Sequence, residues 1–157
     1  MSFFDVVNLW GLLFAALLAA PHVLWFNTHS HDVSGFSNRA MVYIDRTGRF
    51  FSVLLMAVNI GVLEKGFPEP KALMERFWLI TTAVLIAAYL LCWLLLFKTE
   101  KKGAALAVTL IAAAIVIFSG IMQVKILLVT AGVVYLIGEL YMLNQYFIQS
   151  SNKMQNH

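Results

Sequence analysis

The sequence predicts an all-α protein, a five-transmembrane-helix bundle that forms one integral-membrane domain over residues 1–157. Of its residues, 61% are hydrophobic and 12% are charged, whereas soluble domains average about 45–50% apolar and about 25% charged. The apolar residues gather in five blocks, and a helix needs about 20 apolar residues to cross the hydrocarbon of a bilayer. The first partner that the composition predicts is therefore the lipid bilayer itself.

The first block covers about residues 4–26. No Lys or Arg precedes it and no A-x-A site follows it, so we expect a retained span and not a cleaved signal peptide. Pro21 lies near its end, where a proline removes one helix hydrogen bond and can kink the chain. A polar loop is predicted after it. That loop contains His29, His31 and Asp32, but such a short set without further ligands favours a solvated loop over a metal site.

The second block, about residues 40–63, contains a charged segment. Residues 50–63 are 14 residues without formal charge, roughly 21 Å of helix against a hydrocarbon core of about 30 Å. The helix is therefore expected to begin near Arg39 or Ala40 and to bring Asp45 and Arg49 to or just below the headgroups. These two residues are spaced i,i+4 and can pair. Two interpretations stay open: a positive-inside helix end with snorkelling arginines, or a charged half-buried site.

The remaining blocks cover about residues 77–97, 104–123 and 126–147. The last two cannot be one helix, because 44 residues would measure about 66 Å. A tight turn is therefore predicted near residues 120–125. We also expect a turn at residues 66–70, a charged loop at 98–103 and a frayed polar tail at 149–157.

Five spans place the two termini on opposite sides of the membrane. The basic residues number four on one side and seven on the other: Lys65, Lys71, Arg76 and Lys125, against Arg39, Arg46, Arg49, Lys98, Lys101, Lys102 and Lys153. The positive-inside rule then predicts N-terminus out and C-terminus in, in the bacterial cytoplasmic membrane. A four-span alternative requires the second block to lie on the surface.

Glu139 is the strongest single candidate for a functional residue, because it lies inside an apolar run. An ionisable group in a span is costly unless it is paired, protonated or hydrated. The alternative is a structural acid bonded to a neighbouring helix. In the predicted orientation Glu139, His22 and Arg49 fall in the cytoplasmic half, and we hypothesise that they form one polar pocket. The further pocket candidates are Arg46, Asp45 and Asn59, with Tyr141 and Asn144 at a similar level.

The segment from Asn38-Arg39 through Asp45-Arg46-x-Gly48-Arg49-Phe-Phe to Asn59 resembles a family of small bacterial multi-pass membrane proteins with no established function. In that family the acid is commonly Glu, where this chain has Asp45. The resemblance implies a multi-span fold and a role for Arg39, Asp45, Arg49 and Asn59. It implies no catalytic residue.

Several function classes lack support in the sequence. The basic residues lie between apolar blocks, so they are topology signals and not a nucleic-acid surface. Cys92 is the single cysteine, which excludes an intramolecular disulfide and a cysteine-based metal site. There is no Gly-rich phosphate loop, GxSxG sequence or Cys–His pair, and we predict no cofactor and no metal.

The favoured hypothesis is a non-enzymatic binding or transport module. It would take a small amphiphile or ion through a cytoplasm-facing polar pocket, as a homodimer or beside another membrane protein. The first alternative is a structural or immunity-type protein that partners a membrane protein. The second is a lipid-modifying membrane enzyme with His22 and Glu139 as an acid–base pair.

Overall fold

The computed structural model describes residues 7–28, 38–58, 68–99 and 101–155. These residues form five helices and no strand, apart from an isolated bridge between Val7 and Val58. The helices are α2 (Leu9–Thr28), α3 (Arg39–Ala57), α4 (Pro68–Thr99), α5 (Lys102–Met122) and α6 (Ile126–Gln155). The predicted all-α class is confirmed.

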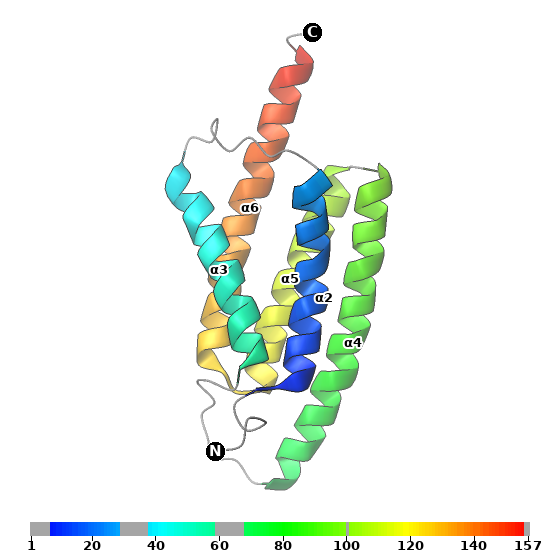
Figure 1. Cartoon of the computed structure of the whole chain (residues 1–157), viewed down its shortest axis with the longest axis vertical. Helices are drawn as coiled ribbons and strands as arrows, with labels where there is room; N and C mark the ends of the chain where they lie inside the picture. The colour runs from blue at the N-terminus through cyan, green and yellow to red at the C-terminus, as the bar shows by residue number, and fades with distance from the viewer. Residues whose placement is uncertain (1–6, 29–37, 59–67, 100, 156–157) are drawn as a thin grey trace.

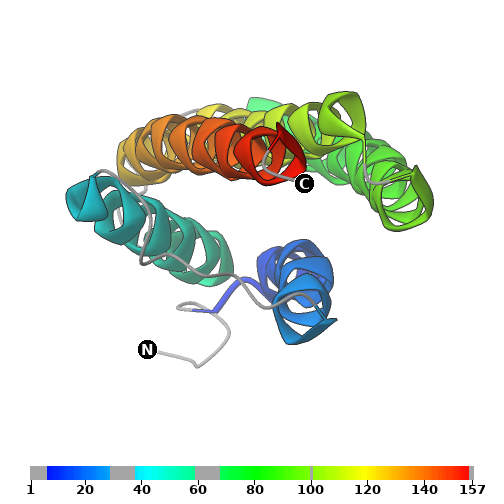
Figure 2. The ribbon, with the colours of Figure 1, turned by 90° about the horizontal axis from the view of Figure 1, so that it is seen from above.

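The five helices run alternately in opposite directions along the bundle (Figure 1). Seen from above, α4, α5 and α6 form one layer, and α2 and α3 lie across it (Figure 2). Contacts link α3 to α6, α6 to α5, α5 to α4, α4 to α2 and α2 back to α3. The first residues of α2 and the last residues of α6 lie at opposite ends of the bundle (Figure 1).

Three of these helices are long and apolar enough to cross a membrane: Ala72–Thr99, Lys102–Met122 and Ile126–Gln149. The apolar part of α2, Leu9–Trp25, is shorter. Helix α3 has 19 residues but carries Arg39, Asp45, Arg46 and Arg49. By length and composition, therefore, three helices qualify as spans where the sequence predicted five.

The first two helices are shorter than their predicted blocks. Helix α2 begins at Leu9 because the Asn8 side chain accepts a hydrogen bond from the Gly11 N–H (3.0 Å) and caps the helix start. Helix α3 begins at Arg39, as predicted, behind Asn38, whose side chain accepts from the Ala40 N–H (3.1 Å). It ends at Ala57, where the prediction continued to residue 63; residues 59–67 lie outside the described part.

Two other helices are longer than predicted. Helix α4 starts at Pro68, within the turn predicted at residues 66–70, because proline is well suited to the first turn of a helix. Helix α6 continues to Gln155, so the tail predicted to fray from residue 149 is helical through that residue. An apolar block marks the uncharged length of a helix, whereas the ends of the helix are set by caps and backbone hydrogen bonds.

The predicted turn between α5 and α6 is confirmed at residues 123–125. Val124 has a positive φ of 53°. The Lys125 N–H donates to the Gly120 carbonyl (2.8 Å) and the Val124 N–H donates to the Ile121 carbonyl (3.1 Å). This pair of bonds is the Schellman arrangement that ends helices.

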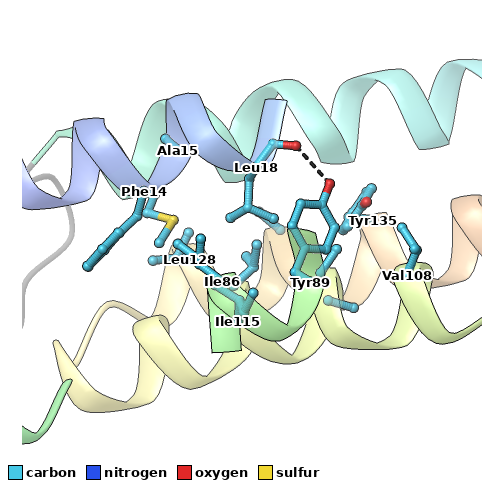
Figure 3. Close-up of a cluster of buried hydrophobic side chains, with 14 of the residues drawn as sticks. Phe14, Ala15, Leu18, Ile86, Tyr89, Val108, Ile115, Leu128 and Tyr135 are labelled. Atoms are coloured by element: carbon cyan, nitrogen blue, oxygen red, sulfur yellow. Dashed lines mark hydrogen bonds between the residues drawn. The ribbon is translucent and has the colours of Figure 1, made fainter. Parts of the chain in front are cut away.

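Buried side chains fill the space between the two layers (Figure 3). Tyr89, Ile115 and Leu128 are each 0% exposed, and Figure 3 shows them with Phe14 and Leu18 of α2 in the same cluster. Inside a membrane such packing contributes mainly through van der Waals contact and hydrogen bonds, because lipid tails are as apolar as the side chains.

Helices α3 and α6 approach each other most closely where glycines lie. A Cβ added to Gly138 would be 2.5 Å from the Cα of Asp45, and one added to Gly48 would be 2.7 Å from the backbone nitrogen of Tyr135. Small residues permit such close approach of membrane helices. The contact aligns Asp45 with the turn of α6 that carries Glu139.

Candidate functional site

Four ionisable side chains from three helices meet inside the bundle: His22 of α2, Asp45 and Arg49 of α3, and Glu139 of α6. We refer to these four residues as the polar cluster. The Arg49 guanidinium donates to both carboxylate oxygens of Asp45 (3.1 and 3.4 Å) and to Glu139 Oε1. His22 Nε2 lies 3.2 Å from the same Glu139 oxygen. The structure thus brings together His22, Arg49 and Glu139, which the sequence suggested as neighbours, and it shows the predicted Asp45–Arg49 pair.

The cluster lies well inside the bundle. His22 is six residues before the end of α2 and Arg49 is ten residues after the start of α3, about 9 Å and 15 Å along their helices. Asp45 is 3% exposed and Glu139 is 9% exposed. Buried carboxylates are stable only with compensating partners, because an unpaired buried charge costs several kcal/mol. Arg49 provides a cation to both, and its guanidinium carbon lies 5.8 Å from the centre of the Tyr135 ring.

Tyr89 of α4 connects the cluster to the backbone of α2. Its hydroxyl donates to the Leu18 carbonyl (2.9 Å; Figure 3). His22 Nδ1 lies 3.1 Å from the Tyr89 hydroxyl oxygen and 3.4 Å from the Leu18 carbonyl. Tyr89 was not among the predicted site residues. The available signal was a tyrosine inside an uncharged span, since a buried tyrosine hydroxyl needs a hydrogen-bond partner.

His22 makes contacts through both ring nitrogens. Nδ1 faces the Tyr89 hydroxyl and the Leu18 carbonyl, and Nε2 faces Glu139 Oε1. Either nitrogen of a neutral imidazole can carry the proton, and the tautomer determines which of them donates. The ring thus joins Glu139 of α6 to Tyr89 of α4.

A pocket lies between α2 and α3, next to the cluster. Its enclosed volume is about 30 Å³, and the empty space counted out through its open side is about 350 Å³. Its lining is mostly apolar: Ala15, Leu18, Ala19, His22, Arg49, Ser52, Val53, Met56, Val116 and Tyr135. Its polar groups come from one end, since His22 is the last lining residue of α2 and Arg49 is the first of α3. Glu139 is not part of the lining.

Ser52 is the unexpected polar residue of this pocket. It is 3% exposed, and its hydroxyl has no hydrogen-bond partner among the residues that the structure describes. A buried hydroxyl without a partner costs roughly 1–3 kcal/mol. Serine is ordinary in membrane helices, so Ser52 was not among the predicted site residues.

The other predicted site residues lie elsewhere. Arg46 is exposed and Asn144 is exposed, while Tyr141 is half-buried; Arg46 is not part of the polar cluster. Asn59 lies outside the described residues, as do the loop residues His29, His31 and Asp32. Within the described ranges, no three His, Cys, Asp or Glu side chains are placed to hold a metal ion.

Lys125 is a structural residue that the sequence analysis counted as a surface charge. It is 1% exposed, and its Nζ donates to the carbonyls of Val58 (3.1 Å) and Leu55 (3.4 Å). An ammonium there complements the negative end of the α3 dipole. Burial lowers the pKa of the Lys125 ammonium from 10.5 to about 8.

The chain matches no protein-family model, no curated protein and no solved structure in our comparisons.

Proposed function

We propose that this chain is a five-span protein of the bacterial cytoplasmic membrane that binds a small amphiphile in the pocket between α2 and α3. The binding would be non-enzymatic, and the polar end of the pocket would face the cytoplasmic half of the membrane. The observation that carries the proposal is the pocket itself: an apolar cavity whose polar groups lie at one end and include an unpartnered hydroxyl.

The distribution of charge on α3 supports its place as a span. Asp45 is buried and Arg49 is half-buried, and both are paired inside the bundle. The outward side chains of α3 include large apolar ones, namely Tyr43, Ile44, Phe50, Phe51 and Leu54. Arg46 is seven residues from the helix start, about 10 Å, within reach of a snorkelling side chain. The helix thus turns its costly charges inward and offers lipid an apolar surface.

The orientation is proposed from the basic residues. With α2 entering from outside, the ends of α2, α4 and α6 are cytoplasmic, and Arg39, Lys98, Lys101 and Lys102 gather there. Burial of Lys125 as a helix cap removes one basic residue from the opposite side, which strengthens the asymmetry on which the rule depends.

A ligand of the pocket should be found by native mass spectrometry of the protein purified in mild detergent. Ala19 lines the pocket and Ala20 is exposed on the same helix. We expect a bound small molecule on the wild-type protein and on Ala20→Leu, and its loss from Ala19→Leu, whose larger side chain fills the cavity. Equal occupancy of both variants, or no bound molecule on any of the three proteins, would contradict the proposal.

The ion pairs that join three helices in the polar cluster favour a second candidate, a structural or immunity-type protein that partners another membrane protein. In that case the cluster holds helices together and the pocket is a packing defect. Filling the defect would then stabilise the protein, so Ala19→Leu should raise the unfolding temperature without removing any ligand. The lipid-modifying enzyme has less support, because Glu139 does not line the pocket.

A further inference from the structure

We infer that the molecule bound between α2 and α3 is electrically neutral and carries one hydroxyl or carbonyl oxygen, which bonds the Ser52 hydroxyl. This inference rests on the proposed function and specifies its ligand class. It is drawn from the mutual pairing of the charged groups in the polar cluster, the unpartnered Ser52 hydroxyl and the apolar lining.

The charged groups next to the pocket are bonded to one another. Arg49 donates to the carboxylates of Asp45 and Glu139, and His22 Nε2 lies 3.2 Å from Glu139 Oε1. The uncharged groups that face the cluster include the Tyr89 hydroxyl, the Tyr135 ring and the Trp93 ring, whose centre lies 5.2 Å from that of His22. Arg46 of α3 also acts electrostatically on Asp45, but its side chain is exposed.

Helix α5, the remaining helix of the bundle, adds no charge at this level. Its one charged residue, Lys102, is the first residue of α5, and its Nζ lies 5.5 Å from the centre of the Phe147 ring. An anionic or cationic head in the pocket would therefore have to compete for charged groups that already pair with one another. In a membrane interior such a charge is expensive, so a neutral head is favoured.

Ser52 provides the specific contact for that head. Its hydroxyl can donate one hydrogen bond and accept others, which suits an alcohol or a carbonyl. The lining below it, which includes Ala15, Val53 and Met56, is apolar and suits an aliphatic or aromatic body. The polar end of the ligand would then lie near His22 and Arg49.

The test uses three probes with one tail and different heads: decan-1-ol, decane-1-sulfonate and decylammonium. The protein is reconstituted in lipid nanodiscs, each radiolabelled probe is added to equal mole fraction in the bilayer, and probe retained per protein is measured above empty discs. We expect decan-1-ol to bind at least about tenfold more tightly than either charged probe. Ser52→Ala should weaken decan-1-ol binding by about two- to tenfold, the range of one hydrogen bond.

Ser52→Ala should fold normally, because it removes a hydroxyl that has no partner in the described structure. Thr47→Ala, at an exposed position of the same helix, is the matched control and should bind decan-1-ol as the wild type does. The inference is overturned if a charged probe binds as tightly as decan-1-ol, or if Ser52→Ala binds it unchanged. In either case, the proposed function still stands if Ala19→Leu abolishes the binding of the probe that does bind. If the wild-type protein retains none of the three probes, the proposed function is overturned as well.

Discussion

Replacing Arg49 by methionine should be the most damaging single change in α3. The variant removes the cation that Asp45 and Glu139 share. The two buried carboxylates, 3% and 9% exposed, then lack that partner. Hydrogen bonds to charged groups contribute roughly 1.5–3 kcal/mol each, and two carboxylates lose theirs. The desolvation cost of the guanidinium is recovered, so we expect a net loss of about 3–5 kcal/mol, the usual cost of breaking a buried ion pair.

Arg46→Met is the matched control on the same helix. Arg46 is exposed and not part of the polar cluster, so its replacement should change the free energy of unfolding by about 0.5 kcal/mol or less. At roughly 2–4 °C per kcal/mol for a chain of this size, Arg49→Met should unfold about 6–20 °C below the wild type and Arg46→Met within about 2 °C.

The chain supplies its own reporter for this assay. Cys92 is the single cysteine and is half-buried in α4, so a thiol-reactive fluorescent dye follows its exposure as the detergent-solubilised protein is heated. Both variants keep Cys92, and their curves can be compared directly. Equal unfolding temperatures for the two variants would refute the reasoning, because the Arg49 contacts would then contribute no more than an exposed arginine.

Two further predictions concern the helix contacts. Gly138→Ala places a methyl group 2.5 Å from the α3 backbone, so it should destabilise the protein by about 1–3 kcal/mol; Gly103→Ala, with nothing within 4 Å, should be neutral or slightly stabilising in the same thermal assay. Because burial lowers the pKa of Lys125 to about 8, the unfolded chain holds this proton more tightly between pH 8 and 10.5, and stability should rise with pH over that interval. In Lys125→Met, the free energy of unfolding should lack this part of the increase between pH 8 and 10.5. The same pH dependence of stability in the variant and the wild type would contradict the prediction.

The sequence predicted the helices and one of their meeting points for identifiable reasons. Apolar length alone separates α5 from α6, because their combined blocks are too long for one span. The second block has too few uncharged residues to cross a membrane, so the start of α3 was predicted near Arg39 or Ala40. The helix does begin at Arg39. Depth along the spans then put His22, Arg49 and Glu139 at a similar level.

What the sequence left open depends on rotation of each helix about its axis. Hydrophobicity shows little of that rotation when both lipid and core are apolar, so it did not show that Tyr89 and Ser52 face the interior of the bundle. A local cue did exist: Gly48 precedes Arg49 and Gly138 precedes Glu139. A small residue beside a charged one marks a helix face that can approach another backbone closely.

The polar cluster also determines how far the pocket can widen. One wall of the pocket is α2, which packs mainly on α3 and α4. The bond between His22 and Glu139 ties α2 to α6 at the polar end of the pocket, and the Tyr89 hydroxyl ties the Leu18 carbonyl of α2 to α4. Any movement of α2 away from α3 must therefore stretch both contacts. The side chains that pair the charges of the cluster thus also hold this wall of the pocket in place.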